Sequence, residues 1–125
     1  MADDIRDGLK YTKTHEWVKL LGAKAKIGIT DHAQHELTDI VFVELPTVGK
    51  EIKKGEELCV VESVKSVSEV YAPISGKIAS VNTKLDDSPE FINSSPYDDG
   101  WLVEIEVKDK SEVNTLLDAA AYKKL

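Results

Sequence analysis

The sequence lacks the features that define several common classes of protein. Its single cysteine, Cys59, rules out an internal disulfide framework and a cysteine-rich metal site. No run of apolar residues is long enough to span a bilayer, and the opening Met1-Ala2-Asp3-Asp4 is acidic where a secretory signal is basic. We therefore predict a cytoplasmic protein with no membrane contact, mitochondrial only if a transit peptide has been removed.

Positive charge is also scarce. Sixteen lysine and arginine residues stand against 23 aspartate and glutamate residues, which gives a net charge of −7 at pH 7. Such a surface repels a phosphate backbone, so we predict no nucleic-acid partner. The length of 125 residues is enough for one domain with a real core and too short for a second, so residues 1–125 are predicted to form a single domain.

Most of the chain has the pattern of β-structure. Segments rich in β-branched and aromatic residues, bounded by turn formers, predict strands. The main ones cover residues 15–20, 25–29, 40–45, 58–61, 67–71 and 101–107. A short helix is expected over residues 31–37, because Thr30 can cap its first turn.

The two ends of the chain differ from this pattern. Residues 1–8 are polar and are predicted to form a loose N-terminal arm. Residues 111–124 are predicted to form a C-terminal helix with Ser111 as its cap. The helix would carry an apolar stripe of residues spaced i, i+3, i+4 and i+7, namely Val113, Leu116, Leu117 and Ala120.

An internal repeat organises the middle of the chain. Residues 39–52 align with residues 66–79, and both copies read strand, Pro-x-x-Gly-Lys, strand, at a constant offset of 27 residues. Two copies are too few for a solenoid. They fit a small β-structure in which two similar halves wrap around one core.

Lys65 lies where the first half of the repeat gives way to the second. The strand patterns on either side predict that it is presented at the tip of a hairpin. The tip nevertheless lacks Asn-Gly or Asp-Gly, and the β-branched Val64 is a poor candidate for positive φ. Conflict between local chemistry and fold is typical of functional sites, so Lys65 is the leading candidate for one.

Other patterns give no site. His32 and His35 are three residues apart and could bind a metal, but no third ligand follows at a recognisable spacing, so we predict no metal site. His15-Glu16 lacks the second histidine of a helical zinc-protease motif and lies in a strand pattern. Cys59 lies in an apolar strand and is interpreted as a buried hydrophobic residue rather than a reactive thiol.

Several short motifs occur along the chain in a fixed order: Lys10-Tyr11, Thr14-His15-Glu16-Trp17, Gly28-Ile29-Thr30-Asp31-His32-Ala33-Gln34, Asp39-Ile40-Val41-Phe42-Val43-Glu44-Leu45-Pro46, Glu62-Ser63-Val64-Lys65, Tyr71-Ala72-Pro73-Ile74-Ser75-Gly76, Ile92-Asn93-Ser94-Ser95-Pro96-Tyr97 and Gly100-Trp101. Together they resemble the H-protein family of the glycine cleavage system. The resemblance implies a mainly β barrel-sandwich hybrid of two quasi-repeated halves, with a short internal helix and a C-terminal α-helix.

The resemblance also implies a cofactor. Lipoate would be attached covalently, as an amide, to Lys65 within a motif completed by Glu62, Ser63, Val64 and Ser66. The protein would then be a non-catalytic carrier rather than an enzyme.

Its partners follow from the same resemblance. The carrier would take the aminomethyl group of glycine from a pyridoxal-phosphate glycine decarboxylase to a tetrahydrofolate-dependent aminomethyltransferase, and electrons to dihydrolipoyl dehydrogenase. A lipoate-attaching enzyme would be a further partner.

The loaded arm carries an ammonium group that water can remove, so a protective carboxylate is expected. Glu16 and Glu69 are the candidates, with Thr14 as a hydrogen-bond partner. A charge pair about 4 Å apart is worth ~1 kcal/mol in water but ~4 kcal/mol at an effective dielectric near 20. We therefore expect a docking site that is partly shielded from water.

Two positions depart from the family pattern, and two other functions stay open. Thr38 replaces a usual glycine and Ser66 a usual alanine, which puts the local geometry there in question. The alternatives are an H-like lipoyl donor or scaffold for another lipoate-dependent pathway, and a β-sandwich interaction module without a prosthetic group. A biotin carrier fits less well, because biotin domains usually place methionines beside the lysine.

Overall fold

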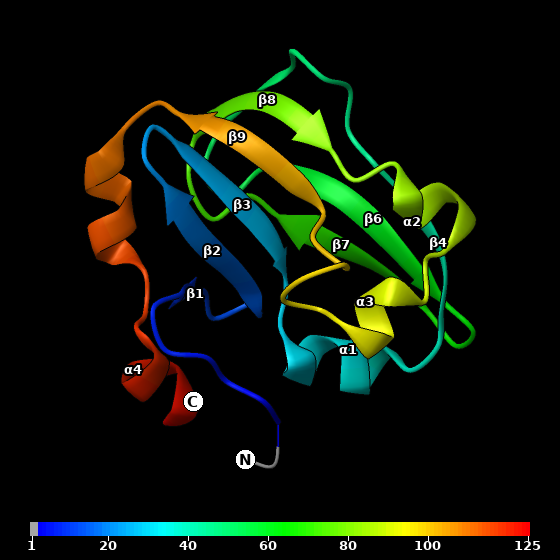
Figure 1. The fold of residues 1–125 in the computed structure, drawn as a ribbon. Helices are drawn as coiled ribbons and strands as arrows, with labels where there is room; N and C mark the ends of the chain where they lie inside the picture. Colours follow the sequence, from blue (N-terminus) through cyan, green and yellow to red (C-terminus); the bar gives the residue numbers. More distant parts are fainter. Residues whose placement is uncertain (1–2) are drawn as a thin grey trace.

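The computed structural model of the protein describes residues 3–125 and consists of two antiparallel sheets packed face to face (Figure 1). The larger sheet has the order β1-β2-β3-β9-β8-β5, and its strands are β1 (Lys10–Tyr11), β2 (Glu16–Leu21), β3 (Lys24–Ile29), β9 (Val103–Val107), β8 (Gly76–Val81) and β5 (Glu51–Ile52). The smaller sheet has the order β4-β6-β7, with β4 (Ile40–Glu44), β6 (Glu57–Ser63) and β7 (Val67–Tyr71). The predicted mainly β barrel-sandwich fold is confirmed.

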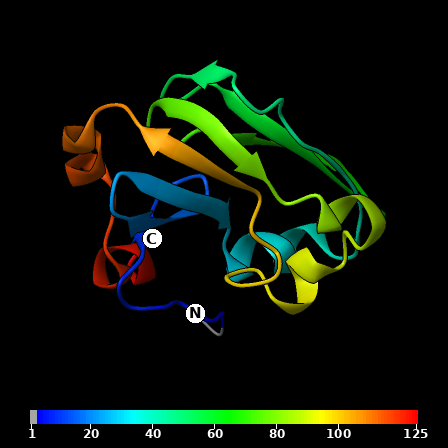
Figure 2. The same ribbon diagram turned by 45° about the horizontal axis from the view of Figure 1, so that its top comes forward.

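Short helices close the two ends of the sandwich (Figure 2). One end carries α1 (Asp31–Leu37), α2 (Lys84–Asp87) and α3 (Phe91–Ser94), and the other carries the 3₁₀ helix η1 (Lys110–Thr115) and α4 (Ala119–Lys123). Thr30 caps α1 as predicted, because its hydroxyl accepts a hydrogen bond from the Ala33 N–H at 3.2 Å. Within residues 3–125, none of the helices has the length and apolar character needed to cross a membrane.

One cluster of buried apolar side chains joins the two sheets. Both sheets supply β-branched residues to it, among them Ile27, Ile78 and Ile105 from the larger and Val43, Val61 and Val70 from the smaller. Cys59 is buried in the same cluster, as predicted, and burial raises the pKa of its thiol, so it is not a reactive group.

The sequence repeat marks the two places where the chain crosses from the smaller sheet to the larger one. β4 and β7, the first strands of the two copies, both pair with β6, and β5 and β8, the second strands, pair with each other. The repeated glycine serves different purposes in the two copies. Gly49 has φ 94°, whereas a Cβ on Gly76 would lie 2.3 Å from the Glu106 carbonyl oxygen on β9.

The prediction of one helix over residues 111–124 is wrong. The chain forms η1 and α4 with an extended stretch between them, where the Leu117 N–H and C=O exchange hydrogen bonds with Tyr11 at 2.8 and 2.7 Å. Asp118 then starts α4 by accepting the Ala121 N–H at 2.8 Å. The buried anchor of α4 is Tyr122, stacked on Tyr11 with ring centroids 4.6 Å apart, and not the predicted stripe.

The prediction of a loose arm over residues 1–8 is wrong for the part that the structure describes. Residues 3–8 have no regular secondary structure, but the Tyr97 hydroxyl donates to the Asp4 carbonyl at 2.6 Å and the Arg6 guanidinium lies 5.0 Å from the centre of the Tyr97 ring. Residues 1–2 lie outside the described part. The segment is therefore polar but not loose, because the buried Tyr97 contacts its backbone and the Arg6 side chain.

Thr38 has a positive φ, as a glycine would, and it occupies the position where members of the family usually have glycine. Its φ of 64° and ψ of −150° are ordinarily adopted only by glycine. The Thr38 N–H donates to the Gln34 carbonyl at 3.0 Å, and the Thr38 carbonyl accepts from the Asn93 side-chain amide at 2.8 Å. These bonds hold the strained residue in place at the exit from α1.

Candidate functional site

Lys65 lies at the tip of the hairpin between β6 and β7, as predicted. Glu62 and Val67 are the last paired residues of the two strands, and Val64 and Lys65 form an exposed bend beyond them. Neither bend residue has positive φ, since His15 and Thr38 are the only non-glycine residues in the described chain that do. The tip therefore does not need the Asn-Gly or Asp-Gly that it lacks.

Ser63 closes this turn. Its hydroxyl oxygen accepts hydrogen bonds from the Ser66 N–H at 3.1 Å and, at 3.3 Å, from the Lys65 N–H, and the Ser63 N–H donates to the Ser66 carbonyl at 2.8 Å. The Val64 N–H is fixed by the Asp39 carbonyl at 3.0 Å. A serine side chain can thus stand in for a glycine turn, which explains why the local sequence looks unlike a tight hairpin.

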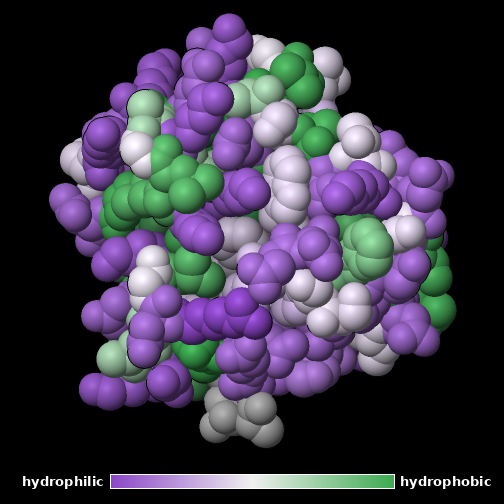
Figure 3. Space-filling view, viewed as in Figure 1, coloured by the Kyte–Doolittle hydropathy of each residue, from purple (hydrophilic) through white to green (hydrophobic). Residues whose placement is uncertain are grey.

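The Lys65 ammonium group has no ion pair or hydrogen bond with residues 3–125, and the side chain is exposed. Apolar side chains flank it: Val64 and Val67 are 66% and 64% exposed, and a bulge in β4 leaves Val41 and Phe42 both exposed. The face drawn in Figure 3 is mainly hydrophilic, with separate hydrophobic areas. We define Val41, Phe42, Val64 and Val67 as the apolar rim of the lysine.

A cleft with a volume of about 380 Å³ lies at the other end of β7. Tyr71 ends β7 six residues after Lys65, which corresponds to about 20 Å along a strand. Residues from three separate segments line the cleft, namely Thr12, Thr14, Glu16, Lys54, Gly55, Tyr71, Ala72 and Pro73. The predicted pair Thr14 and Glu16 is therefore brought together here.

Glu16 is held by neutral donors on both carboxylate oxygens. Oε1 accepts from the hydroxyls of Thr12 and Thr14, and Oε2 accepts from the Tyr71 N–H at 3.3 Å. The turn that makes this possible contains His15 with φ 71°, whose N–H donates to the Thr12 carbonyl at 3.2 Å. The turn folds both threonines back onto the start of β2.

The Glu16 carboxyl group is buried, with 2% of the residue exposed. Burial raises its pKa, and the hydrogen bonds from Thr12, Thr14 and Tyr71 act in the opposite direction. Within residues 3–125, no cationic nitrogen lies within 4.0 Å of it. A buried carboxylate that makes no ion pair with the described residues, and that opens into a cleft, is suited to receive a cation.

The raised pKa of Glu16 predicts a pH dependence of stability. The folded chain binds the Glu16 proton more tightly than the unfolded chain, in which a glutamate titrates near pH 4.3, so ionisation of this group opposes folding. The contribution of Glu16 to stability is complete below that pH and is lost as the pH rises through the folded-state pKa. The free energy of unfolding of Glu16→Gln and of the wild type can be measured with urea at about pH 4 to 7. The value for Glu16→Gln minus the value for the wild type should increase with pH. A difference independent of pH would contradict the assignment.

Glu69 lies beside the cleft without lining it. Its side chain is exposed and accepts the Tyr71 hydroxyl at 2.8 Å, so Tyr71 bonds Glu16 through its backbone and Glu69 through its phenol. The sequence did not single out Thr12 or Tyr71. Two threonines just before Glu16 were the available signal for Thr12, while the contact with Tyr71 depends on how the sheets pack.

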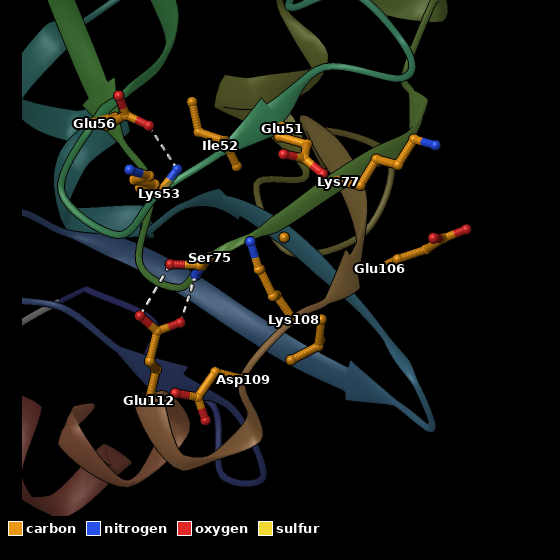
Figure 4. Close-up of a pocket in the computed structure, with 12 residues that line it drawn as sticks. Glu51, Ile52, Lys53, Glu56, Ser75, Lys77, Glu106, Lys108, Asp109 and Glu112 are labelled. Atoms are coloured by element: carbon orange, nitrogen blue, oxygen red, sulfur yellow. Dashed lines mark hydrogen bonds between the residues drawn. The ribbon is translucent and has the colours of Figure 1, made fainter.

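Another cleft, of about 760 Å³, lies beside the edge strand β5 (Figure 4). There the Glu112 carboxylate accepts hydrogen bonds from the Ser75 N–H at 2.8 Å and the Ser75 hydroxyl at 3.0 Å, which ties η1 to the turn before β8. Neither Lys65 nor Glu16 lines this cleft, so it is not part of the candidate site.

Known proteins resemble this chain over nearly its whole length. A family model described as "Glycine cleavage H-protein" matches residues 9–125. The chain is 57% identical, over 98% of both lengths, to a glycine cleavage system H protein of Endomicrobium trichonymphae. It is 58% identical to one of Coprothermobacter proteolyticus, over 95% of this chain and 94% of that protein. A crystal structure of a glycine cleavage system H protein from Mycobacterium marinum superposes with a TM-score of 0.85 at 37% identity, over 96% of this chain and 97% of that one.

Proposed function

From the premise that this chain belongs to the glycine cleavage H-protein family, we propose that Lys65 is the residue that carries its lipoate. Members of the family are non-catalytic subunits with lipoate attached covalently to a lysine, and this chain is a lipoyl carrier of the glycine cleavage system. The observation that supports Lys65 is its exposed ammonium group, which makes no ion pair with residues 3–125, at a turn fixed by Ser63. Mapping the attached mass to one lysine tests the assignment.

The hairpin suits the chemistry of a carrier. A free lysine amine is mostly protonated at neutral pH, with an ordinary pKa of about 10.4, and amide formation removes its charge. Lipoate supplies a disulfide that accepts a group or two electrons. The residues of the chain present that group: Ser63 and the Val64 N–H fix the turn, while the Lys65 side chain is exposed and has no competing partner in the described part of the chain.

Membership of the glycine cleavage system implies partner enzymes. We propose that these are a pyridoxal-phosphate glycine decarboxylase, a tetrahydrofolate-dependent aminomethyltransferase, dihydrolipoyl dehydrogenase and an enzyme that attaches lipoate. All four act on Lys65 or its load, so they must approach the β6–β7 hairpin. The apolar rim of Val41, Phe42, Val64 and Val67 offers them a contact surface beside it.

We further propose that the cleft at Glu16 holds the loaded arm. The load carries an ammonium group, and the cleft contains a buried carboxylate whose bonds all come from neutral donors. Burial makes the attraction strong: a pair about 4 Å apart is worth ~4 kcal/mol at an effective dielectric near 20, against ~1 kcal/mol in water. Thr14 orients Glu16, and Glu69 adds negative charge at the entrance through its contact with Tyr71.

The decay of the loaded protein tests this role. We expect Glu16→Gln to speed loss of the aminomethyl group by at least about tenfold, since 1.4 kcal/mol corresponds to a factor of ten in an equilibrium. Glu69→Gln should have a smaller effect, because Glu69 is exposed and solvent screens its charge. The measurement is the rate at which ammonia and formaldehyde are released from the isolated, loaded protein.

Glu44→Gln is the matched control, because it removes an exposed carboxylate from the smaller sheet away from the cleft. Its decay rate should equal that of the wild type. Unchanged decay in both Glu16→Gln and Glu69→Gln would remove the support for a protective role, even if Lys65 carries lipoate.

The domain organisation and the location are also proposals. One apolar cluster shared by both sheets supports residues 1–125 as a single lipoyl-carrier domain. A cytoplasmic location stays a prediction from the sequence.

A further inference from the structure

The three histidines of the chain gather at one face of α1. The ring centroids of His15 and His32 are 4.5 Å apart, and His35 lies three residues after His32 on the helix. Asp3 reaches this face from the N-terminal segment, which ends to the lower left of α1 in Figure 1. One Asp3 oxygen bonds His32 Nδ1 at 2.9 Å, and the other contacts His35 Nδ1.

Asp31 adds a second carboxylate. Its Oδ2 lies 3.9 Å from His35 Nδ1, and the ligand atoms of Asp3, Asp31 and His35 all lie within 4.8 Å of one another. Zinc bonds to nitrogen and carboxylate oxygen are about 2.0–2.2 Å long, which places tetrahedral ligand atoms about 3.3 Å apart. The three atoms therefore need shifts of only about 1 Å to surround one ion.

Neighbouring groups already orient these ligands. His32 holds the second oxygen of Asp3, and Asp31 accepts from the Asp4 N–H and the Gln34 side-chain amide, each at 2.8 Å. Only 13% of the Asp3 side chain and 16% of the Asp31 side chain are exposed. Hydrogen bonds from outside the ligand set are what fixes carboxylate ligands in metal sites.

We propose that Asp3, Asp31 and His35 bind one zinc ion, with the fourth position open to water. Two carboxylates and one imidazole form a nitrogen–oxygen donor set that zinc accepts, and their charge offsets that of the ion. The ion fastens the N-terminal segment to α1. His32 is a positioning residue that acts through Asp3. Because Asp3 and His32 are 29 residues apart in sequence, no motif based on residue spacing would reveal the site.

Titration with zinc chloride tests the proposal. Isothermal calorimetry on the lipoylated protein, with the lipoyl disulfide oxidised so that no thiolate competes, should show one zinc ion per chain. Buried Cys59 offers no alternative ligand. Cobalt(II) should give the visible absorption of a tetrahedral site. Asp3→Asn and His35→Ala should each weaken zinc binding by at least about 10–100-fold, because loss of a group that only hydrogen-bonds to a ligand already lowers metal affinity by that factor.

Glu44→Gln is the control, because it removes an exposed carboxylate on β4 that belongs neither to the ligand set nor to the groups that orient it. It should bind zinc as the wild type does, and all variants should unfold cooperatively without metal. Absence of one-to-one binding, or affinity unchanged in both Asp3→Asn and His35→Ala, would overturn the proposal.

Discussion

Replacing Lys65 with arginine is expected to leave the protein folded and to remove both its lipoate and its activity in glycine cleavage. Arginine keeps the length and charge of the side chain, but its guanidinium stays protonated and forms no amide under these conditions. The side chain is exposed and makes no ion pair with residues 3–125 that arginine would disrupt. Turnover reconstituted with the decarboxylase, aminomethyltransferase and dehydrogenase should fall to the level without this protein, and the melting temperature should not change.

Lys77→Arg is the matched control. Lys77 is an exposed lysine that occupies the Pro-x-x-Gly-Lys position of the second repeat copy, so it tests whether any lysine in this fold supports turnover. The variant should be modified and active as the wild type is. Activity retained by Lys65→Arg, or lost equally in both variants, would contradict the assignment.

Replacing Trp17 with alanine should destabilise the fold strongly. Trp17 is fully buried, and its indole N–H donates to the Pro96 carbonyl at 3.0 Å, so the substitution leaves both a cavity and an unpaired carbonyl. Tryptophan-to-alanine changes in cores cost about 3–5 kcal/mol. Urea unfolding of Trp17→Ala should show a loss of that size in the free energy of unfolding. A loss under about 1 kcal/mol would show that the indole is not an anchor of this core.

Gly28 provides a sharper test of the same packing. It lies opposite Trp17 in the β2–β3 register, and a Cβ at Gly28 would lie 2.6 Å from atoms of the indole. We expect Gly28→Ala to cost about 1–3 kcal/mol in the wild type, as overpacking does. In the Trp17→Ala background the same change should cost almost nothing, since the space is then free. Equal costs in the two backgrounds would contradict this packing, because contacting residues should not be additive.

Local patterns were enough to predict most strands, α1 and the position of Lys65. The repeat was informative because each copy supplies one strand to each sheet. The prediction of one C-terminal helix was wrong for two reasons. Apolar spacing does not show that Asp118 caps a second, separate helix, and it does not show that Leu117 pairs with Tyr11. That pairing joins distant parts of the chain, and a helix pattern carries no information about it.

The candidate sites divide in the same way. Thr14 and Glu16 are neighbours in sequence, so one motif located both, whereas Tyr71 reaches Glu16 only because the two sheets bring the end of β7 to the start of β2. His32 and His35 showed the helical spacing of ligands, but the missing partner, Asp3, comes from a segment that composition alone made look loose. Lipoate itself could not be read from physical pattern and came from the family resemblance.

The central claim is that Lys65 alone carries the lipoyl group. The most direct measurement is intact mass, followed by proteolysis and tandem mass spectrometry, on protein purified from cells able to make lipoate. We predict one lipoyl increment per chain, found entirely on the peptide that contains Lys65, and no increment in Lys65→Arg. An increment on a different lysine, or none in the wild type, would contradict the account.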